Sequence, residues 1–338
     1  MKDYLADPAF PDDVWTATTP EAEGLRSAPL MDLAAKIESR NLAIHALLVI
    51  RHGRRVFERY GLEDGRQLDP SDLHVLASTT KTFAGTLVGI AIDEGLIPSV
   101  RSRVLDFFEP GEVANPSPAK DRMILEDVLT MRSGIAFREG VDAEYELFDE
   151  PCSACRFLSR PLAGEPGVTW NYSSANSQVL VEIVRRATGR TPLEYAQEKL
   201  FTPLGITQVR WPADGGGTNL GGFDLALRPR DLARFGWMLL EGGRWNGAQL
   251  VPEEWLRAAT RQHAVSTSSF TPKDGYGYQC WIPRFGGFAT RGFRGQNMYM
   301  LPDRHLLVVM NGALEPATTD AVADDLVERF VLPAVIGG

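Results

Sequence analysis

Segments with β-strand character lie near both ends of this 338-residue chain, and the long region between them is mainly helical in pattern. Near the N-terminus, residues 43–50 and 55–60 flank His52-Gly53, which is typical of a hairpin. Near the C-terminus, short strand-like segments follow one another over residues 276–310. Successive strands joined by tight turns pair antiparallel. The economical arrangement is therefore one sheet built from both ends of the chain.

This order predicts an α/β (α+β) fold, in which an antiparallel sheet of N- and C-terminal segments is flanked by helices. A mainly helical lobe is inserted between these segments. We assign residues 1–95 plus 228–338 to the sheet domain and residues 96–227 to the inserted helical domain. A chain of this length has room for about two such lobes. We expect the functional site in the seam between them.

Charge and hydropathy exclude several classes of protein. The 35 basic and 44 acidic residues leave a net charge of −9, which disfavours binding to nucleic acid. A membrane-spanning helix needs about 20 apolar residues, and the chain contains no such stretch. The N-terminal residues, MKDYLADPAFPDDVW, lack the apolar core of a secretory signal. We therefore expect a cytoplasmic protein that contacts neither nucleic acid nor membrane.

The pattern Ser-x-x-Lys occurs twice, at Ser78–Lys81 and at Ser117–Lys120. Residues 78–94 have a helical, mostly apolar pattern, and a serine in a first helical turn shares a face with a lysine three residues later. A neutral lysine could then take the serine proton, provided that its surroundings lower its pKa. Pro118 argues against a common helical face in the second match. Ser78 is the better candidate, and a helix cap followed by an exposed lysine is the alternative.

Two later segments complete a candidate site. Tyr172-Ser173-Ser174 follows a turn and precedes a helix, so its phenol could point into a cleft, although a core tyrosine is the alternative. Residues 292–296, Gly-Phe-Arg-Gly-Gln, lie on a late strand. Glycines in a strand allow close approach of a ligand to the backbone, and a bulge is the alternative. The Gly-rich stretch 214–222 is interpreted as a loop that borders the cleft.

These three segments, in this order, resemble the boxes of the serine β-lactamase and penicillin-binding superfamily. The resemblance is closest to the class C branch, and within it to family VIII-type carboxylesterases and 6-aminohexanoate-dimer hydrolases. It extends over about residues 20–335, with similar stretches at Ile124–Ile135, Glu165–Ser174, Leu227–Gly236 and Leu250–Trp255. The resemblance implies a β-lactamase/DD-peptidase-like fold and a reaction that needs no metal or organic cofactor.

The resemblance also implies a role for each matching residue. Ser78 would be the acylated nucleophile and Lys81 its base partner. Tyr172 would assist proton transfer to the leaving group. The backbone N–H groups of Ser78 and Gln296 would form the oxyanion hole, in which one donor typically contributes about 3 kcal/mol to lowering the barrier.

The sequence departs from the family pattern in two boxes. Ser174 occupies the third position of the tyrosine box, where the class C branch has Asn, and Asn176 lies two residues later. Either residue could take the place of that Asn. Phe293-Arg294-Gly295 aligns with the Lys-Thr-Gly box, so the positive charge moves to Arg294. Loss of this carboxylate anchor disfavours β-lactam and peptidoglycan substrates and favours an ester or an amide.

Other motifs have simpler interpretations. Trp170, Trp281 and Phe293 lie beside the boxes and are predicted to line an apolar acyl pocket, with core packing as the alternative. Cys152 and Cys155 form a Cys-x-x-Cys pattern without the flanks of a redox motif or a second cysteine pair for zinc. We interpret them as incidental helix cysteines. In a redox protein, alkylation of these thiols would abolish function.

The sequence thus predicts a serine hydrolase that cleaves ester or amide bonds of a small molecule through a Ser78 acyl-enzyme. A carboxylesterase or an amide hydrolase similar to the 6-aminohexanoate-dimer enzymes is favoured. A β-lactamase or a transacylase of the same fold is the alternative. A non-catalytic ligand-binding relative is an alternative of another class, which the altered boxes at Ser174 and Phe293 leave open.

Overall fold

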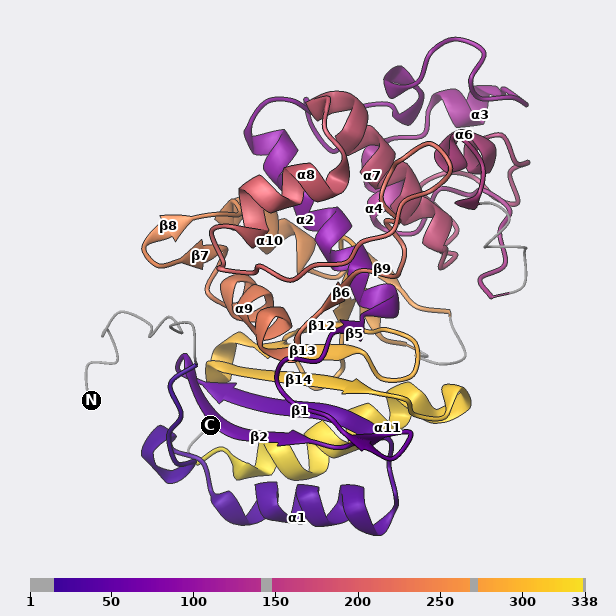
Figure 1. Cartoon of the computed structure of the whole chain (residues 1–338). Helices are drawn as coiled ribbons and strands as arrows, with labels where there is room; N and C mark the ends of the chain where they lie inside the picture. The colour runs from indigo at the N-terminus through magenta and orange to yellow at the C-terminus, as the bar shows by residue number, and fades with distance from the viewer. Residues whose placement is uncertain (1–14, 141–147, 268–272, 337–338) are drawn as a thin grey trace.

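The main sheet contains strands from both ends of the chain. The computed structural model describes residues 15–140, 148–267 and 273–336. Within them, eight strands form an antiparallel sheet in the order β2-β1-β14-β13-β12-β11-β10-β9 (Figure 1). Their bounds are β1 Ile44–Arg51, β2 Arg54–Tyr60, β9 Ala264–Val265, β10 Gly275–Tyr276, β11 Trp281–Ile282, β12 Phe288–Thr290, β13 Asn297–Leu301 and β14 Leu306–Gly312. The predicted α/β architecture with its shared antiparallel sheet is confirmed.

The central strand β1 is buried along its whole length because both faces of the sheet are covered. Successive side chains of a strand point to opposite faces. Accordingly, Leu48 and Ile50 join one apolar cluster, whereas Leu47 and Val49 join the other. This two-sided burial explains why the strand is an unbroken apolar run. The β1–β2 turn at His52-Gly53 has positive φ at both residues, 51° and 75°, as a type I′ hairpin requires.

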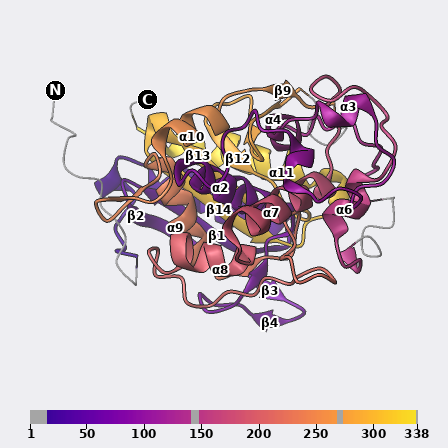
Figure 2. The same ribbon diagram turned by 90° about the horizontal axis from the view of Figure 1, so that it is seen from above.

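Helices form a layer on each face of the sheet (Figure 1). On one side, α1 (Ser27–Ser39) and α11 (Thr319–Leu326) share an apolar cluster with β1 and β14. On the other side, α9 (Pro229–Leu240) contacts β1, β13 and β14. Above α9 lies the helical part of the molecule, which Figure 2 shows from above. It includes α2 Thr80–Asp93, α3 Pro118–Asp121, α4 Leu125–Leu129, α6 Ser153–Leu158, α7 Ser174–Thr188 and α8 Pro192–Ala196, with α10 Glu253–Ala259 beside them.

The chain enters and leaves the helical part at adjacent points. Strand β5 (His74–Val75) pairs with β6 (Ala226–Leu227) in a separate two-stranded sheet. Two further small hairpins pair β3 (Leu62–Glu63) with β4 (Arg66–Gln67), and β7 (Arg244–Trp245) with β8 (Ala248–Gln249). The division of residues 1–95 plus 228–338 from residues 96–227 stays a proposal; the β5–β6 pairing lies close to its second boundary, whereas α2 packs within the helical part.

Helix α2 is buried on all sides, and two glycines permit this packing. A Cβ atom at Gly89 would lie 2.4 Å from the Trp255 ring, and one at Gly85 would lie 3.1 Å from the Gln279 side chain. The helix ends at Glu94, followed by Gly95 with φ 71°, where the sequence predicts its end. The short 3₁₀ turn Ala77–Thr79 that precedes α2 is therefore attached to a rigid element.

Pro118 is the first residue of α3, and Ser117 before it is extended, so Ser117 and Lys120 do not share a helical face, as the sequence predicts. One expectation from the sequence is wrong. Cys152 and Cys155 are not incidental thiols, because they form a disulfide at the start of α6. The third cysteine, Cys280, is a buried free thiol. Among the described residues, no helix is long and apolar enough to cross a membrane.

Candidate active site

The Lys81 ammonium lies at the centre of a cluster of oxygen atoms. Its Nζ donates to Ser78 Oγ at 2.9 Å, to Ser174 Oγ at 2.9 Å and to the Gly222 carbonyl at 2.8 Å. The lysine is 1% exposed, so these contacts replace the water that it has lost. Three elements distant in sequence thus converge on one ammonium group: the turn before α2, the start of α7 and the 214–222 loop.

The turn that carries Ser78 has an unusual backbone. Ala77, which immediately precedes Ser78, has φ 46°, in a region that non-glycine residues rarely adopt. Such conformations persist only where the surroundings enforce them, and they cluster at functional sites. The Thr80 hydroxyl donates to the Ala77 carbonyl at 2.7 Å and closes the turn. Ser78 itself is partly exposed at the start of the buried helix.

Tyr172 packs next to the lysine. Its ring centroid lies 4.9 Å from Lys81 Nζ, and the ring belongs to an aromatic cluster with Trp170, Tyr276 and Trp281. Ring centroids within the cluster are 4.9–6.2 Å apart. Of the three residues predicted to line an acyl pocket, Trp170 and Trp281 therefore lie beside Tyr172. Tyr276 is an additional member, which the sequence did not single out.

Ser174, not Asn176, occupies the position beside the lysine. The Asn176 side chain is 1% exposed, and its Nδ2 donates to Met131 Sδ at 3.4 Å, while its Oδ1 has no partner among the described residues. Both residues lie in the first turn of α7, but they point in different directions because a helix turns by about 100° per residue. The choice that the sequence left open is thus decided by helix phase.

Glu139 is a member of the site that sequence reasoning missed. Its carboxylate accepts the backbone N–H of Ser174 at 2.6 Å and also accepts the Ser174 hydroxyl. Glu139 Oε1 lies 3.9 Å from Lys81 Nζ, and the Glu139 side chain is 29% exposed. Ser174 therefore accepts from the lysine and donates to the carboxylate. A glutamate in an irregular loop, 35 positions before Ser174, carries no local signal of this role.

The segment after β12 lies beside the nucleophile turn. The Thr79 hydroxyl donates to the Gln296 carbonyl and contacts Thr290 Oγ1 at 2.9 Å. A Cβ atom at Gly292 would lie 2.5 Å from the Leu76 carbonyl oxygen, so only glycine permits this approach. This is the close backbone approach that the sequence predicts for residues 292–296.

Gln296, the predicted oxyanion donor, has a partner within its own turn. Its backbone N–H donates to the Gly292 carbonyl at 3.2 Å, because residues 292–296 form a tight turn with φ 63° at Arg294 and 93° at Gly295. Phe293 is exposed, with 63% of its surface accessible. Arg294 is also exposed, and its guanidinium donates to the Ala313 carbonyl at 3.2 Å.

A buried ion cluster supports the aromatic cluster from behind. The Arg291 guanidinium lies 5.9 Å from the Trp281 ring and contacts Asp274 at 2.7 Å and Asp324 at 3.0 Å. Asp320 lies at 3.9 Å from the same guanidinium. Burial raises the pKa of Asp320 to about 6, although Arg291 opposes this shift. The cluster fixes the end of β12, from which the 292–296 turn starts.

Comparison with known proteins agrees with this geometry. The sequence profile of the Beta-lactamase family matches residues 33–332. The chain belongs to this family. It is a serine hydrolase of the β-lactamase fold, as the resemblance of the boxes implies.

Individual relatives point to ester and amide hydrolases. The 6-aminohexanoate-dimer hydrolase of Paenarthrobacter ureafaciens is 29% identical over 304 residues, covering 83% of this chain and 74% of the relative. A penicillin-binding protein homologue from Caulobacter crescentus superposes with a TM-score of 0.76 at 18% identity, covering 94% of this chain and 98% of the homologue. A family VIII carboxylesterase superposes with a TM-score of 0.73 at 17% identity, covering 94% of this chain and 98% of the carboxylesterase. At these identities, the two structures show the shared fold.

Proposed function

We propose that this protein hydrolyses an ester or amide of a small molecule through an acyl-enzyme on Ser78. The observation that carries the proposal is the buried Lys81 ammonium, which contacts the hydroxyls of Ser78 and Ser174 at 2.9 Å each. A serine hydroxyl next to a lysine can be deprotonated as it attacks a carbonyl carbon. The leaving alcohol or amine then takes a proton by way of Tyr172, and water resolves the acyl-enzyme.

We propose that Glu139 prepares the lysine for this step. The ammonium donates hydrogen bonds to Ser78, Ser174 and the Gly222 carbonyl, so Lys81 must give up a proton before it can accept one. Ser174 accepts from Lys81 and donates to Glu139, so a proton can pass through this hydroxyl to the carboxylate.

The oxyanion hole is proposed to use the backbone N–H groups of Ser78 and Phe293. Gly292 lies against the carbonyl of Leu76, two residues before the nucleophile, so the next N–H in the chain is brought to the same place. Among the described residues, the Phe293 N–H has no hydrogen-bond partner, unlike that of Gln296. Such preorganised donors stabilise the charge that develops on the carbonyl oxygen.

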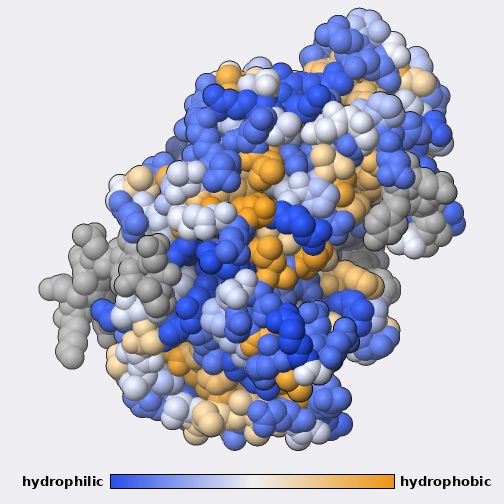
Figure 3. Space-filling view, in the orientation of Figure 1, coloured by the Kyte–Doolittle hydropathy of each residue, from blue (hydrophilic) through white to orange (hydrophobic). Residues whose placement is uncertain are grey.

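The surface around the site favours an apolar, uncharged acyl group. The four-ring cluster beside Tyr172 offers apolar walls. Figure 3 shows apolar surface gathered across the middle of one face, over the region where β5 and β6 lie near the start of α2. Leu73 and Val75 are exposed there, with accessible fractions of 43% and 40%. Arg294 is directed to a backbone carbonyl, which is a poor arrangement for anchoring a β-lactam carboxylate.

The test is labelling of the protein with a fluorophosphonate, followed by intact mass and peptide mapping. We expect one adduct on Ser78 and turnover of p-nitrophenyl esters or a linear amide dimer, with much slower turnover of a chromogenic cephalosporin. Ser78→Ala should take no label and should not turn over substrate. An unlabelled wild type, or a Ser78→Ala variant with unchanged activity, would refute the proposal. Products formed with an added alcohol or amine separate hydrolysis from acyl transfer.

A further inference from the structure

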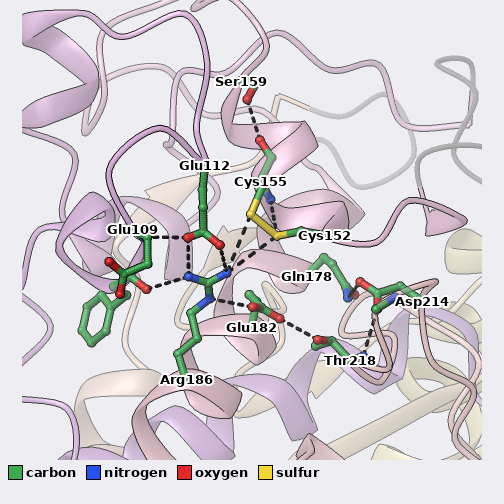
Figure 4. Close-up of a disulfide and its surroundings, with 12 residues drawn as sticks. Glu109, Glu112, Cys152, Cys155, Ser159, Gln178, Glu182, Arg186, Asp214 and Thr218 are labelled. Atoms are coloured by element: carbon green, nitrogen blue, oxygen red, sulfur yellow. Dashed lines mark hydrogen bonds and ion pairs between the residues drawn. A yellow bond between two sulfur atoms is a disulfide. The ribbon is translucent and has the colours of Figure 1, made fainter.

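The disulfide between Cys152 and Cys155 lies against a half-buried cationic side chain (Figure 4). Arg186 Nη2 is 3.9 Å from Cys152 Sγ and 3.8 Å from Cys155 Sγ. The backbone N–H of Cys155 also donates to Cys152 Sγ at 3.1 Å. Cys155 is buried, whereas Cys152 is half-buried at the start of α6. Cys152 is thus the more accessible residue of the pair, and N–H donors are directed at both sulfurs.

Two carboxylates hold Arg186 from its other side. Glu112 accepts from the guanidinium at 2.6 and 3.0 Å, and Glu182 accepts at 2.6 Å. The hydrogen bond to Glu112 raises the pKa of Arg186, so the guanidinium stays charged. The two carboxylates offset the positive charge of Arg186. The main effect of Arg186 on a sulfur anion is therefore a hydrogen bond from a fixed N–H group.

The same arginine is the first member of a hydrogen-bond network that leads away from the disulfide (Figure 4). Glu182 accepts from the Thr218 hydroxyl at 2.5 Å. The backbone N–H of Thr218 donates to Asp214 at 2.9 Å, and Asp214 accepts from Gln178 Nε2 at 3.2 Å. Arg186 and the 214–222 loop are therefore joined through buried polar groups.

The network continues to the catalytic lysine. The Gln178 amide oxygen accepts the backbone N–H of Gly221 at 2.9 Å. The next residue, Gly222, provides the carbonyl that accepts from Lys81 at 2.8 Å. A path of hydrogen bonds therefore leads from Arg186 to Lys81, and the step from Gly221 to Gly222 is along the backbone of the loop.

The disulfide segment also packs directly on this loop. A Cβ atom at Gly216 would lie 1.8 Å from the Pro151 carbonyl oxygen, and one at Gly215 would lie 2.2 Å from the Asp149 carbonyl oxygen. The backbone of residues 149–151, immediately before Cys152, is therefore in contact with the backbone of the 214–222 loop. A displacement of the cysteine segment cannot be absorbed by side chains at this contact, so the loop must respond.

We propose that Cys152 and Cys155 form a reversible thiol–disulfide exchange site whose state is transmitted to Lys81 through residues 214–222. The reductant is an external dithiol. One of its thiolates attacks the Cys152 sulfur, the S–S bond breaks, and the electron pair remains on Cys155 Sγ, next to the Arg186 N–H. The second thiol of the reductant resolves the mixed disulfide and leaves as a cyclic or protein disulfide. Both cysteines finish as thiols with the protons of the reductant.

Reduction changes the contacts of Arg186. Once the covalent bond is broken, the two sulfurs move apart to van der Waals separation, and a guanidinium that contacts both must shift. The shift is passed to Glu182 and Thr218, which contact it in sequence. This second half of the inference rests on the proposed function, because it predicts a change in the hydrolysis that Lys81 supports.

The exchange itself is tested without any hydrolase assay. The native protein is treated with dithiothreitol, alkylated and measured by intact mass. We expect two alkyl groups on wild type and on Cys280→Ser, which serves as the matched control, and none on the Cys152→Ser/Cys155→Ser variant. Burial raises the pKa of Cys280 to about 12, so this thiol stays unmodified. Arg186→Lys should slow reduction severalfold while leaving the number of reducible pairs unchanged. A wild type that takes up no alkyl group unless it is denatured would overturn the proposal.

Transmission is tested by comparing oxidised and reduced protein. We expect faster amide hydrogen exchange over residues 214–222 after reduction and a change of at least about twofold in kcat/KM for a p-nitrophenyl ester. Thr218→Val, which removes the hydroxyl but keeps the backbone N–H, should abolish the change in rate and leave the disulfide intact. Equal hydrogen exchange in the two states would refute transmission. If neither state turns over substrate, the proposed function fails, while mass and hydrogen exchange still decide the exchange site.

Discussion

The two Ser-x-x-Lys segments of this chain share a sequence pattern and differ in what their lysines contact. Lys81 donates to its serine and to two further oxygens at 2.8–2.9 Å. Lys120 instead donates its Nζ to the Asn115 carbonyl at 2.9 Å, while its backbone N–H donates to Ser117 Oγ at 3.3 Å. Ser117 is therefore a helix N-cap, the ordinary role that was the alternative interpretation for Ser78.

Burial alone does not distinguish the two lysines. Lys120 is 2% exposed and Lys81 is 1% exposed, and burial lowers the pKa of Lys120. The two lysines differ in the number of distant chain segments that contact them. Residues from α7 and the 214–222 loop meet Lys81, whereas Lys120 is satisfied by its own loop. A buried lysine beside a serine becomes a candidate catalytic group only when a second acceptor network can take its proton.

The serine pair provides the largest expected difference. Ser78→Ala removes the nucleophile and should lower kcat for a p-nitrophenyl ester by at least about 10⁴-fold. Ser117→Ala should leave kcat unchanged and reduce the free energy of unfolding by about 1 kcal/mol, since only a cap is lost. Steady-state kinetics and urea unfolding of both variants provide the check. Loss of activity in Ser117→Ala with intact folding would contradict the comparison.

The lysine pair should follow the same order with a smaller effect. Lys81→Met removes the proposed general base and should lower kcat by about 10²- to 10⁴-fold. Lys120→Met keeps the length of the side chain, and we expect wild-type kcat and KM. The measurement is initial rate against substrate concentration, with circular dichroism to confirm folding. Equal losses in both variants would show that burial, and not convergence on Ser78, sets the role of these lysines.

The proton path beyond Lys81 can be tested at Glu139. Glu139→Gln keeps the shape of the side chain but removes the charge, and should lower kcat/KM by about 10- to 100-fold, the range of one charge-assisted hydrogen bond. The acidic limb of the pH–rate profile should also move to lower pH, because the carboxylate that favours the charged Lys81 ammonium is gone. Glu253→Gln, at an exposed glutamate of α10, is the control and should change neither. An unshifted acidic limb would assign Glu139 a purely structural role.

The smallest expected effect is a pH dependence of the free energy of unfolding that comes from Lys120, in the Ser117–Lys120 segment. Because burial lowers the folded-state pKa of Lys120 below its ordinary value of 10.5, the unfolded chain binds more protons between these two values. Wild type should therefore gain stability relative to Lys120→Met as pH rises toward 10.5. Chemical unfolding of both proteins at pH 7 and pH 10 measures this difference. A difference that stays constant with pH would contradict it.

Much of the fold could be predicted from local patterns. The run Ile44–Arg51, the turn at His52-Gly53 and the strand-like segments after residue 275 carry the signals of period and turn chemistry that pairing requires. The buried α2 helix is likewise visible as an apolar segment that ends near Gly95. Pro118 acts in the same local way, because it keeps Ser117 extended and itself begins α3.

The site was predictable only in part. Ser78, Lys81 and Tyr172 were proposed from their boxes, and the structure places these three side chains together. Glu139 escaped because its contact with Ser174 spans 35 positions and leaves no periodic trace. The hydrogen bond of the Gln296 N–H within the 292–296 turn could not be predicted, because it depends on φ angles at Arg294 and Gly295, which the alignment of boxes does not contain.

The sequence by itself determined the shared sheet, the family and the candidate nucleophile, because these depend on short-range period, turn residues and box order. Only the tertiary structure decided which Ser-x-x-Lys lysine meets residues distant in sequence, that Ser174 and not Asn176 faces Lys81, and that Cys152 and Cys155 are joined. The physical reason is distance along the chain. Lys81 meets Ser174 and Gly222 across 93 and 141 positions, and such contacts exist only once the sheet and α7 have packed around α2.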